Sequence, residues 1–410
     1  MRSRPTVVFA LVAAALVAGS VQAQTSPLVR AFQSLNPDLS VIVDSGAGYQ
    51  SAPPGYIAGD DPLLPVNRFG HALGFTVQEV ELAFSAVVDP YLKGEIYLTI
   101  PNLSGLEVEE AVATTTSLPF NLQVRAGSLR SAFGRQNGQH LHVQEFQQRP
   151  LVNAAFLGSD GLRGPGAQLS WLVPLPVFVT LYLEGYSLTA PADPAAFSTF
   201  GGDNGGLTGL AHAKLFLELT DDLSLSWGVS SALGRSSTVT GTPTGDTVNH
   251  FNPSGDTALF GSDVYLKWKP ANQSDGYFAL SLQGEILLRH APDLVAAGTN
   301  ARVAAAWDGG LYAQVVAQLA RRVTLGLRFD LLGLPSSALV PEVNRESVAL
   351  TFWLSEFAKF RASAYAEHTG GYGAGAQLFG ALGRTGPNTD TFGALAQLEM
   401  SIGAHGAHTF

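Results

Sequence analysis

A two-residue alternation of apolar and polar side chains runs through most of this 410-residue chain. In the segment 323–331, every odd position is apolar, and the even positions are Thr, Gly, Arg and Asp. Successive side chains of a β-strand point to opposite faces, so this period predicts strands, whereas helical spacings of three and four are nearly absent. Sixteen such segments can be counted: 39–46, 79–88, 92–100, 107–117, 121–128, 167–172, 177–187, 209–220, 223–231, 262–269, 276–289, 309–320, 323–331, 347–354, 359–367 and 391–410.

The connections between these segments alternate between short and long. Short turns such as Asp89-Pro90, Asp221-Asp222 and Arg321-Arg322 follow every second strand. Most of the other connections are long and rich in Gly, Asn, Asp and Ser: 47–73, 129–166, 188–208, 232–261, 290–308, 332–346 and 368–390. Outer-membrane barrels have tight periplasmic turns and long extracellular loops in the same alternation. We therefore predict an all-β fold, a single transmembrane antiparallel β-barrel of about 16 strands.

A secreted β-sandwich or a β-propeller is the alternative fold. Neither explains why the long loops fall on one side only, and a propeller would repeat its sequence roughly every 40–50 residues, a repeat that is not found. A helical membrane protein is excluded, because no internal run of about 18 uncharged apolar residues occurs. In a barrel, much of the 46% hydrophobic content faces lipid, so no large dry core is needed.

The N-terminal residues predict export. Arg2 and Arg4 precede a short apolar stretch that ends in small residues before Ala23. We expect a signal peptide at 1–23, a short periplasmic segment at 24–38 and the barrel at 39–410. Without the two arginines, 21 basic residues remain against 33 acidic ones, so the net charge is −12. A nucleic-acid-binding protein needs a basic surface instead, so no nucleic-acid partner is expected.

Signals for an enzyme are poor. The chain has no Cys, which excludes a disulfide framework, a Cys-ligated zinc site and a thiol nucleophile. The Gly-x-Ser-x-Gly, His-Glu-x-x-His and phosphate-loop motifs are absent as well. The Gly371-x-Gly373-x-x-Ala376 pattern lies in a Gly-rich loop without a strand-to-helix context and predicts only a turn. We expect neither catalysis nor a cofactor.

Aromatic residues gather beside the short turns: Trp171, Trp268, Trp353, Phe120, Phe178 and Phe360. Barrels that span a membrane carry a ring of aromatic residues at the lipid–water interface, which would explain this clustering. The alternative is that these aromatic residues belong to a hydrophobic core. The last strand ends in Phe410 and resembles the assembly signal of bacterial outer-membrane barrels. These features predict location in the outer membrane after export. The expected partners are outer-membrane lipid, lipopolysaccharide and the barrel-assembly machinery.

Several motifs within residues 36–186 resemble known barrels: Val108-Glu109-Glu110-Ala111, Ser117-Leu118-Pro119, Arg125-Ala126-Gly127, Phe133-Gly134-Arg135, Gln139-His140-Leu141-His142, Arg149-Pro150-Leu151-Val152-Asn153 and Gly161-Leu162-Arg163-Gly164-Pro165-Gly166. The combination is similar to porin-like proteins labelled zinc-regulated or TonB-dependent receptor-like. The Phe-Gly pair before a long loop resembles phosphate-selective porins. A TonB-dependent receptor also carries a plug inside a 22-stranded barrel, and about 387 residues after cleavage are too few for both. The resemblance therefore implies a porin.

A barrel of this size encloses an aqueous lumen, so we expect an outer-membrane porin for passive or weakly selective diffusion of small hydrophilic solutes or ions. A substrate-specific transporter or receptor without a plug, including a metal-related one, is the alternative. Inward positions carry twelve acidic and six basic residues, and this acidic surplus would weakly favour the passage of cations. The alternative is that the charges form a network across the lumen that stiffens the barrel and has no effect on selectivity. Sixteen-strand porins are often trimers, so a homotrimer is the oligomer to test.

Two sets of residues are candidates for selectivity and binding. The pore candidates are Arg130, Arg135, Arg149 and Arg163 in the loop 129–166, and Glu79, Glu81, Lys93, Glu95, Glu107, Glu109 and Arg125 on the strands. If the loop folds inward, its arginines oppose acidic walls. If it stays outside, they pair with one another or with lipid A phosphates, and we favour this outer position. His140 and His142 with Glu145 form a weak zinc candidate, since imidazole and carboxylate both bind zinc.

Overall fold

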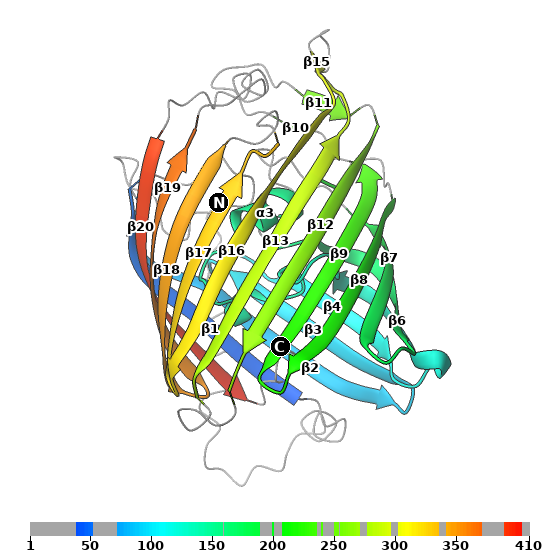
Figure 1. Cartoon of the computed structure of the whole chain (residues 1–410), viewed down its shortest axis with the longest axis horizontal. Coiled ribbons are helices and arrows are strands. Elements are labelled where there is room, and N and C mark those ends of the chain that lie inside the picture. Colours follow the sequence, from blue (N-terminus) through cyan, green and yellow to red (C-terminus); the bar gives the residue numbers. More distant parts are fainter. Residues whose placement is uncertain are drawn as a thin grey trace, which may run out of the picture. The chain divides into compact units, whose positions relative to one another are not determined.

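The chain forms a closed antiparallel β-barrel in this computed structural model (Figure 1). The structure describes residues 38–51, 72–158, 160–188, 199–200, 207–235, 239–240, 250–253, 255–270, 277–296, 302–335, 342–370 and 389–403. Within these ranges the barrel strands are β1 (Asp38–Gln50), β2 (Ala72–Asp89), β3 (Leu92–Pro101), β4 (Glu107–Thr115), β5 (Leu122–Arg130), β6 (Arg163–Val173), β7 (Phe178–Ser187), β8 (Leu207–Thr220), β9 (Leu223–Arg235), β12 (Asp256–Trp268), β13 (Ala279–Ala291), β16 (Ala306–Ala320), β17 (Val323–Leu332), β18 (Val343–Ser355), β19 (Ala358–Thr369) and β20 (Thr389–Gly403).

Each barrel strand pairs with the next one in this order, and β1 pairs with β20 to close the ring. The closing seam runs from Ser40 opposite Gly403 to Gln50 opposite Gly393. All sixteen predicted strands are confirmed, as is the alternation of short turns and longer loops. The predicted signal peptide, the segment up to residue 37 and the terminal Phe410 lie outside the described residues, so those assignments stay predictions.

The two faces of the barrel wall differ as the alternation predicts. On β17, Leu327 and Phe329 are exposed on the outside, whereas Arg328 and Asp330 are buried inside. The six aromatic residues beside the short turns are all exposed: Phe120, Trp171, Phe178, Trp268, Trp353 and Phe360. An apolar outer surface around a polar interior is the arrangement of a barrel that spans lipid.

Some short elements lie where the sequence predicted only loops. A four-stranded sheet consists of β10 (Val239–Thr240), β11 (His250–Pro253), β14 (Leu294–Ala296) and β15 (Arg302–Val303). The helical segments are η1 (Pro119–Asn121), η2 (Leu141–Val143) and α3 (Leu151–Leu157). Among the described residues, no helix is both long enough and apolar enough to cross a membrane.

A dry core fills part of the barrel interior, although the sequence had predicted only that no large one is needed. Inward positions near the long-loop ends of several strands carry apolar residues, and these form what we call the inner apolar belt: Leu129, Leu210, Leu259, Leu287 and Leu332. The belt belongs to the same buried cluster as Phe133, Leu151 and Phe156 from the loop between β5 and β6. Period-two analysis missed this core because a few apolar residues on a polar face do not change the overall alternation.

Candidate functional site

The loop of residues 131–162, here the constriction loop, folds into the lumen, so the predicted outer position is wrong. Several of its apolar residues, among them Phe133, Leu151 and Phe156, are almost fully buried. Helix α3 lies within this loop and packs against β13, β16 and β17 inside the barrel (Figure 1). The helix ends at Gly158, whose φ of 93° is a conformation that glycine adopts without steric cost. Burial of this apolar surface against the inner apolar belt explains the inward position.

One carboxylate on the wall holds the first part of the loop. Glu285 of β13 accepts hydrogen bonds from the backbone N–H groups of Arg135 at 2.8 Å and Gln136 at 2.5 Å. The side-chain amide of Asn153, in α3, donates to the other oxygen of Glu285 at 2.9 Å. Three donors from two parts of the loop therefore converge on one buried acceptor.

Charged side chains of β17 and β19 hold the rest of the loop. Asp330 accepts a 2.9 Å hydrogen bond from the N–H of Leu151, at the N-terminal end of α3. On β19, Lys359 donates to the carbonyl of His142 at 2.6 Å, and Arg361 donates to the carbonyl of Gln144 at 2.7 Å. These contacts bind loop backbone to the wall opposite the strands from which the loop emerges.

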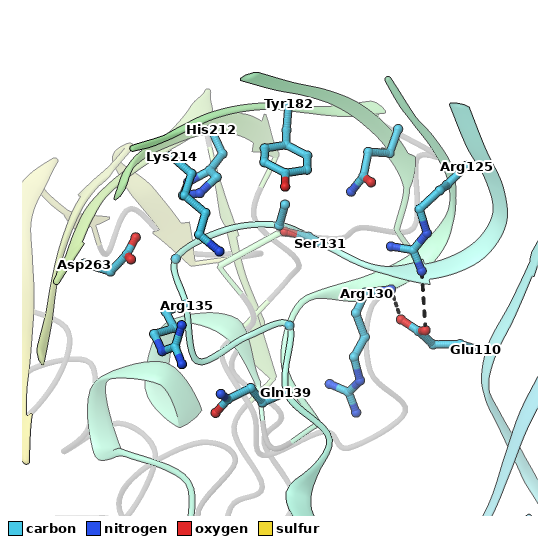
Figure 2. A pocket seen from close by; sticks show the side chains of 14 residues that line it. Glu110, Arg125, Arg130, Ser131, Arg135, Gln139, Tyr182, His212, Lys214 and Asp263 are labelled. Carbon is cyan, nitrogen blue, oxygen red and sulfur yellow. Dashed lines mark hydrogen bonds and ion pairs between the residues drawn. The ribbon is translucent and has the colours of Figure 1, made fainter. Parts of the chain in front are cut away.

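A polar cavity of about 330 Å³ remains between the loop and the wall from β4 to β12 (Figure 2). We call it the constriction cavity. Its charged lining residues are Glu110, Arg125, Arg130, Arg135, Lys214 and Asp263. Lys214 and Asp263 each lie four residues closer to the short-turn end of their strand than Leu210 and Leu259 of the inner apolar belt. Four residues span about 13 Å along a strand, so the cavity lies on the short-turn side of the dry core.

The charge of this cavity differs from that of the wall as a whole. The guanidinium of Arg130 forms a buried ion pair with Glu109, which is not a lining residue. The remaining lining residues carry three positive charges, on Arg125, Arg135 and Lys214, and two negative charges, on Glu110 and Asp263. The net charge of +1 favours anions. Much of the acidic surplus counted from the sequence lies elsewhere, where carboxylates accept hydrogen bonds from the loop or pair with arginines.

A second cluster of polar residues joins the loop to β2 and β4. This His–Glu cluster consists of Glu79, Glu81, Glu109, His140 and His142. His140 Nδ1 lies 3.2 Å from Glu81 Oε2 and 3.1 Å from Glu109 Oε2, and His142 Nδ1 lies 3.3 Å from Glu81 Oε2. Burial lowers the pKa of His142 below its ordinary value, which favours the neutral imidazole. The histidines of the predicted zinc candidate therefore lie beside wall glutamates, whereas Glu145 is exposed and belongs to neither group of clustered ligand atoms.

The other predicted pore residues lie apart from the cavity. Arg163 donates to Glu107 at 3.3 Å, and Lys93 pairs with Glu95 at 2.8 Å on the half-exposed part of β3. Arg149 is buried within the constriction loop, and this burial lowers the pKa of its guanidinium. Arg163 and Lys93 thus form local pairs with Glu107 and Glu95. Arg125, Arg130 and Arg135 are instead brought together at the cavity.

Glu110 was not among the predicted pore residues, because a β-bulge changes the side-chain alternation on β4. Tyr97 pairs with Glu110 and Leu98 with Val108, so Glu109 is an extra residue on β4. A bulge brings two successive side chains to the same face, and both Glu109 and Glu110 are buried inside. Strict alternation had assigned only one of the two glutamates to the lumen. His212 is a further lining residue that the charge count left out, and its Nδ1 lies 2.7 Å from Ser230 Oγ.

Comparison with solved structures identifies the fold. The Acinetobacter baumannii outer membrane channel DcaP has a TM-score of 0.53 at 12% identity, over 89% of this chain and 97% of that one. Pseudomonas putida OprB has a TM-score of 0.53 at 9% identity, over 92% and 96%. An anion-selective porin from Comamonas acidovorans has a TM-score of 0.52 at 10% identity, over 89% and 99%. These neighbours support the porin part of the resemblance, and they do not support the zinc-regulated or TonB-dependent label.

Sequence comparison gives a family relationship without an assigned activity. No protein-family profile matches the chain. A protein of Aquifex aeolicus (strain VF5), described as an uncharacterized protein, is 31% identical over 362 residues, which cover 82% of this chain and 72% of that protein. The chain therefore belongs to the same family as the Aquifex aeolicus protein, and its fold is that of the outer-membrane porin and channel barrels.

Proposed function

We propose that the protein is an outer-membrane channel that passes small hydrophilic solutes by diffusion, with a weak preference for anions. The constriction cavity carries this proposal, because it is a polar space inside a lipid-facing barrel with a net charge of +1. The selectivity is argued from the lining charges of this chain. The fold neighbours named as porins and channels favour transport over catalysis.

The absence of Cys allows a direct test of whether solutes pass the cavity. Lys214→Cys introduces a single thiol among the lining residues. This substitution alone brings the net charge of +1 to zero and should remove the anion preference. Modification with an anionic methanethiosulfonate reagent should reduce the single-channel current in planar lipid bilayers and produce a cation preference. A cationic reagent of similar size should restore the charge and the anion preference.

The matched control for this test is Arg235→Cys, since Arg235 is exposed near the long-loop end of β9 and is not a lining residue. Its modification should leave the selectivity unchanged. Mass spectrometry measures how completely each thiol reacts. Complete modification of Lys214→Cys without any change in current would show that the cavity is not on the solute path.

A substrate-specific transporter is the second candidate, and the dry core inside the barrel favours it. The inner apolar belt and the constriction loop exclude water from part of the lumen, so passage of a larger solute would require the loop to move. For a substrate-specific transporter, uptake into proteoliposomes should saturate with solute concentration, and related solutes should compete with one another. The diffusion channel expects uptake that rises linearly with concentration and depends only on solute size and charge.

The remaining cellular assignments belong to the same proposal. We infer export by the predicted signal peptide, assembly through the C-terminal strand, and contact with lipid and lipopolysaccharide in the outer membrane. A homotrimer stays a prediction, for which the mass of the detergent-solubilised protein, measured by light scattering, is the test.

A further inference from the structure

The strongest unexplained feature of the interior is the position of Glu81. This residue of β2 is 1% exposed, and no ion pair with a lysine or arginine is found for it among the described residues. Its Oε2 contacts the imidazoles of His140 and His142, whereas its Oε1 is buried and has no hydrogen-bond partner in the described part of the chain. A buried carboxylate is costly unless a cation or several donors compensate its charge.

Hydrogen bonding from His140 does not compensate both neighbouring carboxylates. The Nδ1 atom of His140 carries at most one proton, yet Glu81 Oε2 and Glu109 Oε2 lie 3.2 and 3.1 Å from it. Glu109 is itself fixed, because its other oxygen pairs with the guanidinium of Arg130. Two oriented carboxylate oxygens and one imidazole nitrogen therefore face the same small space.

The spacing of these atoms matches the edges of a metal coordination tetrahedron. Zinc binds imidazole nitrogen and carboxylate oxygen at about 2.0–2.2 Å, which places tetrahedral ligand atoms about 3.3–3.5 Å apart. The two measured edges are within about 0.3 Å of this range, and one ligand atom from each of the three residues lies within 4.8 Å of the others. An imidazole ligand favours zinc and its neighbours in the transition series over calcium or magnesium.

We propose that Glu81, Glu109 and His140 form a binding site for one divalent transition-metal ion of the zinc class. Arg130 orients Glu109 in the way that outer-shell partners hold metal ligands, and the imidazole of His142 lies beside Glu81 Oε2. The ion would connect the constriction loop to β2 and β4, on the side of the lumen that the contacts from Glu285 and Asp330 do not reach. Three protein ligands leave one coordination position for water or a solute anion.

Calorimetric titration of the purified, untagged barrel in detergent with ZnCl₂, after treatment with a chelator, tests the proposal. We expect one ion per chain for the native protein. His140→Gln and Glu81→Gln should each weaken binding more than about 100-fold, because loss of an outer-shell partner alone costs about 10–100-fold. His212→Gln is the matched control, since His212 is a buried lumen imidazole that belongs to neither group of clustered ligand atoms among the described residues, and it should bind zinc as the native protein does.

The alternative site in the same cluster is Glu79, Glu81 and His142. Loss of binding in His142→Gln with full binding in His140→Gln would assign the ion to that group and overturn the proposal. Native protein that binds no zinc, or His140→Gln that binds it unchanged, would also overturn it. Heat-dependent gel mobility confirms that each variant is a folded barrel, so a folding failure is not mistaken for a lost ligand.

Discussion

The charge of the constriction cavity predicts that Lys214→Glu reverses the ion preference of the channel. With Arg130 paired to Glu109, the substitution changes the net charge of the other lining residues from +1 to −1. A cavity of 330 Å³ has the volume of a sphere of about 4 Å radius, so the charged atoms lie about 6 Å from its centre once a water radius of about 1.4 Å is added. One unit charge at about 6 Å contributes about 0.7 kcal/mol in water, and screening at about 0.1 M salt reduces this to about 0.4 kcal/mol.

A net charge of +1 stabilises an anion in the cavity by about 0.4 kcal/mol and destabilises a cation by the same amount. The free energies of the two ions therefore differ by about 0.8 kcal/mol, which corresponds to a three- to fourfold preference for the anion. The native channel should therefore show a reversal potential of anion-selective sign in a KCl gradient. Lys214→Glu should show a cation-selective potential of about the same size. Higher salt should shrink both potentials, since screening weakens both preferences equally.

The matched control is Arg235→Glu, which makes the same charge change at an exposed position outside the cavity. It should keep the native sign of the reversal potential. An unchanged sign in Lys214→Glu, or an equal shift in Arg235→Glu, would refute the assignment of selectivity to the cavity. Such a result would mean that selectivity depends on the charge of the whole barrel.

Three further predictions concern the structure that supports this cavity. Glu285→Ala removes the acceptor of three loop donors, each costing about 1–3 kcal/mol when left unpaired, so single-channel conductance should rise and trypsin should cleave the constriction loop faster. Asp308→Asn removes the carboxylate that pairs with the buried guanidinium of Arg289 and should lower the free energy of unfolding by about 3–5 kcal/mol in urea titrations. Asp256→Asn, in an exposed ion pair, should cost less than about 1 kcal/mol. Gly127→Ala should prevent β4–β5 pairing and the heat-dependent gel shift, because its φ is 136° and a Cβ would lie 2.0 Å from a carbonyl oxygen of β4.

The strands could be predicted from the sequence because their pattern has a local physical cause. Each residue of a lipid-facing barrel wall faces either lipid or lumen, so the period-two signal is repeated in every strand. Several observed strands are longer than predicted at their long-loop ends. For example, β12 begins at Asp256, whereas the predicted strand began at residue 262. Apolar residues face inward in these extensions, and the alternation is weaker there.

The inward position of the constriction loop could not be predicted in the same way. Leu151 and Phe156 are apolar in a loop sequence, but only the three-dimensional structure shows that Leu287 and Leu332 face them inside the barrel. The contacts of Glu285 with Arg135 and Asn153 likewise join residues more than 130 positions apart. The histidine pair was visible in the sequence, whereas its glutamate partners come from β2 and β4 and depend on the closure of the barrel.

The contacts of β19 with the constriction loop have a consequence for the order of assembly. Lys359 and Arg361 each bind a loop carbonyl 217 residues earlier in the chain. A chain released or inserted only as far as β9 would already contain the complete loop, but none of the residues of β13, β17 and β19 that hold it. The contacts from β13, β17 and β19 thus form only when the C-terminal strands arrive, and a truncated barrel that still reaches the membrane would hold the loop less firmly and be a leakier pore than the finished one.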